Sequence, residues 1–162
     1  MAAYARGVLR IAARGDTLTL SYVDPSQRES VMLTRQSELQ RVLGNLAEDL
    51  PGPHWVALVD QNGLIVSCVP AEPPIDTDRI SAMTAASAQT AERVLREIEG
   101  GKLRYVNVTG STRQHLTVFL SRERLLSIAL PPEVPAQDTI PPLTRWVPEL
   151  IQVLKKRYVE ES

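Results

Sequence analysis

The longest helical pattern in the chain is DTDRISAMTAASAQTAERVLREIE, from Asp76 to Glu99. Asp76 can cap the first turn with its side chain, and Ile75 before it can pack against Ile80 inside the helix. The two glycines that follow Glu99 can adopt the left-handed conformation that ends a helix. The sequence therefore predicts one amphipathic helix with a defined start and a defined end.

This predicted helix carries two kinds of surface at helical spacing. The first is an apolar stripe made of Ile80, Met83, Ser87, Val94, Leu95 and Ile98. The second is small and mostly uncharged, and consists of Ala82, Ala85, Ala86 and Gln89. Alanine also fills ordinary helix surfaces because it is the best helix former. The small surface is therefore either a plain solvent-exposed surface or a place where a partner approaches closely.

Composition limits the classes of function. A chain of 162 residues can bury a single core, and its net charge of −1 favours neither nucleic acid nor an anionic membrane as a partner. The single cysteine, Cys68, excludes an internal disulfide framework. The start lacks the apolar core of a signal peptide, and no apolar run reaches the ~20 residues that span a bilayer. We expect a cytoplasmic protein.

The N-terminal third predicts strands and then a helix. Residues 17–22 alternate between polar and apolar side chains, as in a half-buried strand. Flanking strands are expected at Val8–Ala12, where a short helix fits nearly as well, and at Val31–Leu33. Ser37 and Gln40 form a capping box that predicts a helix ending at the Pro-Gly-Pro sequence of residues 51–53.

The remaining elements are strands and one more helix. Two apolar runs, Trp55–Val59 and Leu64–Val69, flank Asp-Gln-Asn-Gly and predict a hairpin inside the sheet, because both of its faces are apolar. After the long helix, three strands are expected at Leu103–Thr109, Gln114–Ser121 and Leu125–Leu130. Residues 131–142 are proline-rich and predict an extended connector, and Pro148 suits the first turn of a final helix.

Groups that perform chemistry are sparse. His54 and His115 are far apart, and neither has a cysteine or carboxylate at metal-ligand spacing. Cys68 lies in an apolar run without a basic neighbour, which indicates an inert thiol. Asp60 is explained by the hydrogen bonds of its own turn. No catalytic residue, cofactor or metal site is predicted, and we expect the protein not to be an enzyme.

The order of the motifs resembles the Roadblock/LC7 family. The resemblance rests on Asp60-Gln61-Asn62-Gly63-Leu64-Ile65-Val66, the small-residue helix and three strands that end in Leu125-Leu126-Ser127-Ile128-Ala129-Leu130. The family includes dynein light chains, endosomal scaffold subunits and bacterial regulators of Ras-like polarity GTPases of the MglB type. The resemblance covers a Roadblock/LC7-like domain (37–130), while an N-terminal β-rich extension (1–34) and a long connector (131–142) depart from the family pattern, and a C-terminal helix (143–162) follows.

The resemblance implies a layered α+β fold with a five-stranded antiparallel sheet, one long helix on one face and the terminal helices on the other. Family members dimerise through the long helix and the next strand. The corresponding dimer interface here is Met83, Ser87, Thr90, Val94, Leu103, Tyr105, Val106 and Val108. An apolar edge strand is an aggregation liability unless it is paired, which independently favours a homodimer. The N-terminal strands could cover this edge instead.

The function that the resemblance implies is a non-enzymatic homodimeric interaction module. Its expected partner is a small Ras-like GTPase, which it would activate or hold as a scaffold. The bacterial regulators do not insert a catalytic arginine into their GTPase. The predicted partner-binding residues are Ala82, Ala85, Ala86, Gln89 and Arg93. The alternative is a sensory domain that binds a small molecule between sheet and helix, for which only His115, Tyr105 and Cys68 offer polar groups.

Overall fold

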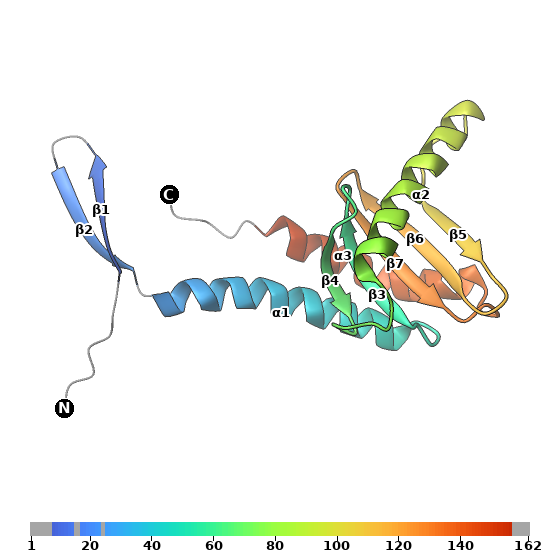
Figure 1. The fold of residues 1–162 in the computed structure, drawn as a ribbon, viewed down its shortest axis with the longest axis horizontal. Helices are drawn as coiled ribbons and strands as arrows, with labels where there is room; N and C mark the ends of the chain where they lie inside the picture. The colour runs from blue at the N-terminus through green and yellow to red at the C-terminus, as the bar shows by residue number, and fades with distance from the viewer. Residues whose placement is uncertain (1–7, 15–16, 24, 157–162) are drawn as a thin grey trace. The chain divides into compact units, whose positions relative to one another are not determined.

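The computed structural model describes residues 8–14, 17–23 and 25–156, and their side chains from Arg35 onward (Figure 1). Contacts divide the chain into two compact units. One contains the N-terminal residues up to Ser37, and the other begins at Glu38. Each unit has a sheet of its own.

The N-terminal unit contains a two-stranded antiparallel sheet and the beginning of a helix. Strands β1 (Val8–Arg14) and β2 (Thr17–Val23) pair with each other, which confirms both predicted strands. The strand predicted at Val31–Leu33 is wrong, because helix α1 runs from Pro25 to Asp49. Proline is well tolerated at the first helical position. Because the helix starts there, Ser37 lies inside it and is not its cap.

The second unit is built on a five-stranded antiparallel sheet, as predicted. Its strands are β3 (Trp55–Asp60), β4 (Ile65–Val69), β5 (Tyr105–Thr109), β6 (Gln114–Ser121) and β7 (Arg124–Leu130), in the spatial order β4-β3-β7-β6-β5. The β3–β4 hairpin was expected inside the sheet, but only β3 is internal and β4 is an edge strand. The apolar composition of β4 reflects cover by helices: Cys68 packs in the α2-side core, and Gln40 of α1 donates hydrogen bonds to the Ser67 hydroxyl and the Cys68 carbonyl.

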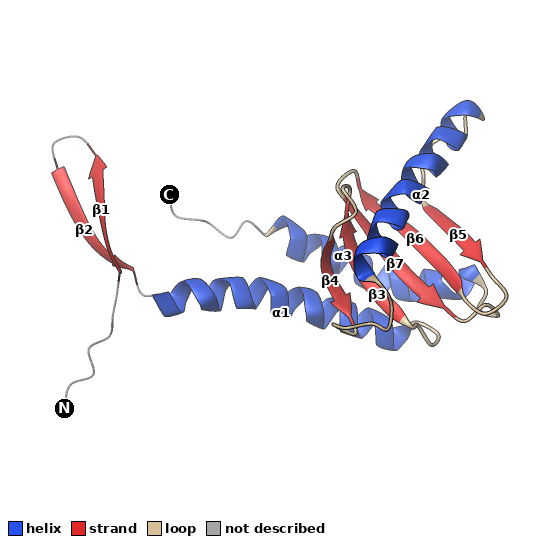
Figure 2. Ribbon diagram, in the orientation of Figure 1, coloured by secondary structure: helices blue, strands red, loops and turns tan. Residues whose placement is uncertain are grey.

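Helices cover both faces of the sheet (Figure 2). Helix α2 (Thr77–Glu97) lies on one face, while α1 and α3 (Ile140–Lys155) lie on the other. The core between α1, α3 and the sheet is made of large aliphatic side chains. The core under α2 is made of smaller ones together with Trp55. The predicted three-layer arrangement is therefore confirmed, and the two layers differ in the size of their side chains.

The C-terminal helix begins earlier than expected. A short 3₁₀ turn, η1 (Ala136–Thr139), leads directly into α3, whose first turn contains Pro141 and Pro142. Prolines are tolerated there because the first helical N–H groups have no partner inside the helix. Part of the predicted connector is thus helical, and Pro148 lies inside α3 instead of in its first turn. The last six residues of the predicted helix, 157–162, lie outside the described residues.

Candidate interaction surface on helix α2 and strand β5

The start of α2 is held against the β3–β4 turn. The Asp76 side chain accepts a hydrogen bond from the Arg79 backbone N–H at 3.0 Å, as predicted for the cap. The Ser81 hydroxyl donates to the carbonyl of Gly63 at 2.6 Å. Gly63 has a φ of +80°, and a Cβ atom at this position would lie 2.8 Å from the Cα atom of Ala82. Only glycine permits both the turn and this close approach of the helix.

One face of α2 packs on the sheet through small side chains. Its buried residues are Ser81, Thr84, Ala85 and Ala88. Ala85 is only 6% exposed, so the prediction that it belongs to an exposed partner-binding surface is wrong. The physical reason is that the sheet offers small residues such as Ala57 and Ala129 beneath the helix, which lets an alanine face pack closely.

The remaining predicted residues of α2 lie on its solvent side. Met83 and Val94 are 65% and 54% exposed, Ser87 is half-buried and Thr90 is exposed. The other predicted partner-binding residues are exposed as well: Ala82, Ala86, Gln89 and Arg93. The two sets occupy neighbouring strips of the same exposed side, because Ala86 is three residues from Met83 and four from Thr90, and residues at these spacings are neighbours on the helix surface.

Strand β5 is an edge strand that no described strand covers. It pairs with β6 on one side, and β1 and β2 pair only with each other. The alternative in which the N-terminal strands cover this edge stays a prediction. Tyr105 and Val108 are 53% and 57% exposed, whereas Leu103 and Val106 are half-buried. A free edge that carries large apolar side chains is a site of association.

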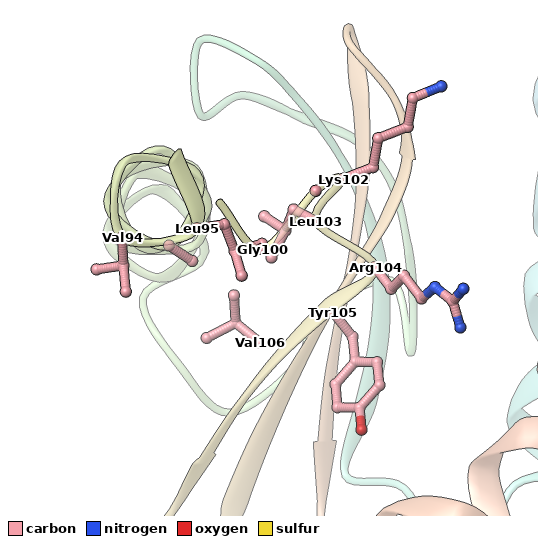
Figure 3. Close-up of a pocket in the computed structure, with 10 residues that line it drawn as sticks. Val94, Leu95, Gly100, Lys102, Leu103, Arg104, Tyr105 and Val106 are labelled. Carbon is pink, nitrogen blue, oxygen red and sulfur yellow. The ribbon is translucent and has the colours of Figure 1, made fainter. Parts of the chain in front are cut away.

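A groove separates the end of α2 from the beginning of β5 (Figure 3). Leu95 of α2 and Val106 of β5 point toward each other in it, while Tyr105 lies on the opposite face of the strand. Lys102 and Arg104 line the groove as well. The sequence did not identify these two basic residues, because they precede the strand and no pattern relates them to the helix.

The end of α2 is closed by an unexpected residue. The N–H of Gly100 donates to the Leu95 carbonyl at 2.7 Å, and the N–H of Glu99 donates to the Arg96 carbonyl. This is the Schellman arrangement, in which the left-handed residue is normally glycine. Here that residue is Glu99, with a φ of +53°. The predicted glycines follow it, and Gly101 has a φ of +77°.

The polar groups considered for a sensory pocket do not converge. Tyr105 is the cross-strand partner of Val118, so it lies on the opposite face of the sheet from His115. Cys68 is buried, and burial raises the pKa of its thiol. His115 is hydrogen-bonded under α2 to Ser127. These three groups therefore do not form one ligand site.

Neither a metal-ligand cluster nor a membrane-spanning helix occurs in the described part of the chain. Among residues 8–14, 17–23 and 25–156, no group of three or more His, Cys, Asp or Glu side chains could hold a metal ion. Within the same ranges, no helix combines the length and the apolar character needed to cross a bilayer.

Comparison with known proteins identifies the fold. The family model described as Roadblock/LC7 domain matches residues 39–118, while no curated protein matches the sequence. A gliding protein MglB from Thermus thermophilus is similar in structure, with a TM-score of 0.64 and 14% identity, over 74% of this chain and 90% of that one. MglB from Myxococcus xanthus has a TM-score of 0.63 and 16% identity, over 73% and 88%.

A Roadblock/LC7 domain from Streptomyces avermitilis is equally similar, with a TM-score of 0.64 and 16% identity, over 71% of this chain and 96% of the other. At these low identities, the TM-scores show a shared fold. About a quarter of the present chain lies outside each of these superpositions. The strand order, the helices on both faces and the family match agree, and residues 39–118 of this chain are a Roadblock/LC7 domain.

Proposed function

We propose that this protein is a non-enzymatic homodimeric module that binds and regulates a small Ras-like GTPase. The observation that carries the proposal is the exposed side of α2 together with the open edge of β5. The residues assigned to self-association are called the association surface below and are Met83, Ser87, Thr90, Val94, Leu103, Tyr105, Val106 and Val108. The residues assigned to the partner are called the small-residue surface and are Ala82, Ala86, Gln89 and Arg93.

The dimer is supported by two features of the association surface. The β5 edge has unpaired backbone groups, and a second copy of the same strand can pair with it about a twofold axis. The exposed Met83 and Val94 of α2 supply apolar area beside this edge. A twofold contact would bury both features together, whereas a single chain leaves them in water.

The GTPase partner is supported by the small-residue surface together with the family resemblance. In the proposed dimer, two copies of α2 lie side by side and present Ala82 and Ala86 from both chains. Short side chains let a facing protein approach without displacing long ones. Arg93 borders this surface and is assigned a contact with the partner. No catalytic arginine is assigned, because the regulators that this chain resembles do not insert one.

The test is binding to Ras-like GTPases of the same organism, each loaded with GDP or with a non-hydrolysable GTP analogue. We expect binding that depends on the nucleotide. Ala86→Arg should weaken it at least about tenfold, because a long charged side chain holds a facing surface apart. Thr144→Arg is the matched control, since Thr144 is an exposed small residue of α3 on the other face of the sheet.

Both variants should remain folded, because arginine is a good helix former at exposed positions. Biolayer interferometry measures the affinities, and circular dichroism checks the helices. Absence of binding to every GTPase in both nucleotide states would contradict the proposal. Equal affinities of Ala86→Arg and Thr144→Arg for the GTPase would show that the partner does not contact the small-residue surface.

A further inference from the structure

The layer between α2 and the sheet is almost free of charge. Helix α2 has no charged side chain between Arg79 and Glu92, and β4, β5 and β6 contain no Asp, Glu, Lys or Arg. Asp60 and Arg124 are cross-strand partners at the ends of β3 and β7. Because side chains along a strand alternate between the two faces, both point to the face covered by α1 and α3, which is opposite to α2. Among the described residues of this layer, His115 is thus the group that can become charged near neutral pH.

The hydrogen-bond partners of His115 are all neutral. Its Nε2 atom lies 2.7 Å from the Ser127 hydroxyl and 3.4 Å from the Thr84 hydroxyl. The Thr84 hydroxyl donates to the Ile80 carbonyl, and Trp55 Nε1 lies 3.4 Å from the same Ser127 hydroxyl. The Nε2 atom of a neutral imidazole is satisfied in this cluster. An imidazolium would find no carboxylate there to compensate its charge.

His115 also lies next to the association surface. It is the cross-strand partner of Val108, which is exposed on the edge strand β5. Its neighbour Thr84 directly follows the exposed Met83 on α2. The imidazole itself is half-buried in the single chain. A second copy that covers Met83 and Val108, which flank His115, would bury the imidazole further.

We propose that His115 makes the association of two copies sensitive to pH, so that its protonation dissociates the dimer. This inference rests on the proposed homodimer. The charged imidazolium keeps part of its hydration in the single chain and loses it when a second copy closes over β5 and α2. The neutral form has no such cost. Each dimer contains two such sites by symmetry.

The sign of the effect follows from burial. Burial lowers the pKa of His115 from its usual 6.5 in the single chain, and the additional burial in the dimer lowers this pKa further. At a pH between the pKa of His115 in the dimer and its pKa in the single chain, two separated chains bind more protons than the dimer does. The dissociation constant is therefore flat above about pH 6.5 and rises as the pH falls, by up to about 100-fold per pH unit for two sites.

The experiment measures the dissociation constant of the full chain by sedimentation equilibrium from pH 7.5 to 5.0. Wild type should dissociate at least about tenfold more readily at pH 5.0. His115→Gln should show no such change, because an amide can hydrogen-bond to Ser127 but does not titrate. His54→Gln should behave as wild type. His54 is the other histidine of the chain, and it is exposed before β3.

Each outcome separates the inference from the proposed function. A stable dimer whose dissociation constant does not change with pH, or changes equally in His115→Gln, overturns the inference and leaves the dimer intact. A wild-type chain that is monomeric at pH 7.5 overturns the dimer itself. Far-UV circular dichroism is recorded at each pH. Loss of secondary structure at pH 5.0, in place of dissociation into folded chains, also overturns the inference.

Discussion

Single residues set the precise limits of α2. At its start, Asp76 supplies the cap, and the lack of a side chain at Gly63 lets the helix pack against the β3–β4 turn. At its end, Glu99 occupies a left-handed conformation that costs a side-chain-bearing residue about 1 kcal/mol or more. The helix therefore ends at a strained residue although two glycines stand immediately after it.

Glu99→Gly should raise the free energy of unfolding by about 1 kcal/mol, because glycine adopts a positive φ without steric cost. The matched control is Glu92→Gly, seven residues earlier, at an exposed position in the interior of α2. That substitution should lower the free energy of unfolding by about 1 kcal/mol, as glycine does in helix interiors. Urea unfolding at one fixed protein concentration measures both changes. A lower free energy of unfolding for Glu99→Gly than for wild type would show that Glu99 is not strained.

At the scale of elements, α2 has one face for the sheet and an exposed side for other molecules. Met83 belongs to the exposed side, so a charge at this position does not have to be buried in the single chain. The apolar stripe in the sequence thus mixes residues with different neighbours. Ile80 packs against the α2-side core, while Met83 and Val94 face solvent.

Met83→Arg should leave the chain folded and shift it from dimer to monomer. Two arginines would face each other across the proposed twofold contact, where like charges repel and cannot be hydrated fully. Multi-angle light scattering at micromolar concentration gives the mass, with wild type expected as the dimer. Ala86→Arg is the control and should keep the dimeric mass. If Ala86→Arg dissociates the chain and Met83→Arg does not, the two surfaces have been assigned in the wrong places.

Several elements could be predicted from the sequence because their signals are local. The cap at Asp76 and the strand Gln114–Ser121 depend on neighbouring residues, and both are confirmed. The start of α1 at Pro25 could not be predicted in this way. Val31–Leu33 is compatible with helix and strand alike, and the continuous helix decides between them.

The candidate surface could be predicted only in part, for a related reason. Alanine suits both an exposed surface and a tightly packed one. The choice for Ala85 depends on the small residues that β3 and β7 place beneath it, such as Ala57 and Ala129. Those contacts are distant in sequence. No local pattern separates Ala85 from Ala86, although one is buried and the other is exposed.

At the scale of the whole molecule, the Roadblock/LC7 domain has its own core. The aliphatic core begins with Leu39 of α1 and includes residues of β3, β6, β7 and α3. The N-terminal strands belong to the other compact unit. The domain should therefore fold without them.

Removal of residues 1–24, which keeps α1 from its first residue, should preserve both the fold and the dimer. The expected change in melting temperature is a few degrees at most, since the described core loses no residue. Differential scanning calorimetry and light scattering measure the two properties. A truncated chain that is unfolded or monomeric would show that the N-terminal unit takes part in the core or in the association.

The two edges of the five-stranded sheet have different neighbours. On the β4 edge, the Gln40 side chain of α1 donates a hydrogen bond to the carbonyl of Cys68. On the β5 edge, no described strand pairs with the outer side of β5. A chain with two open edges can add copies at both ends and grow into a fibre. In the proposed dimer, β5 pairs with its own copy about a twofold axis, and such a contact is closed, so raising the concentration fills dimers without lengthening them.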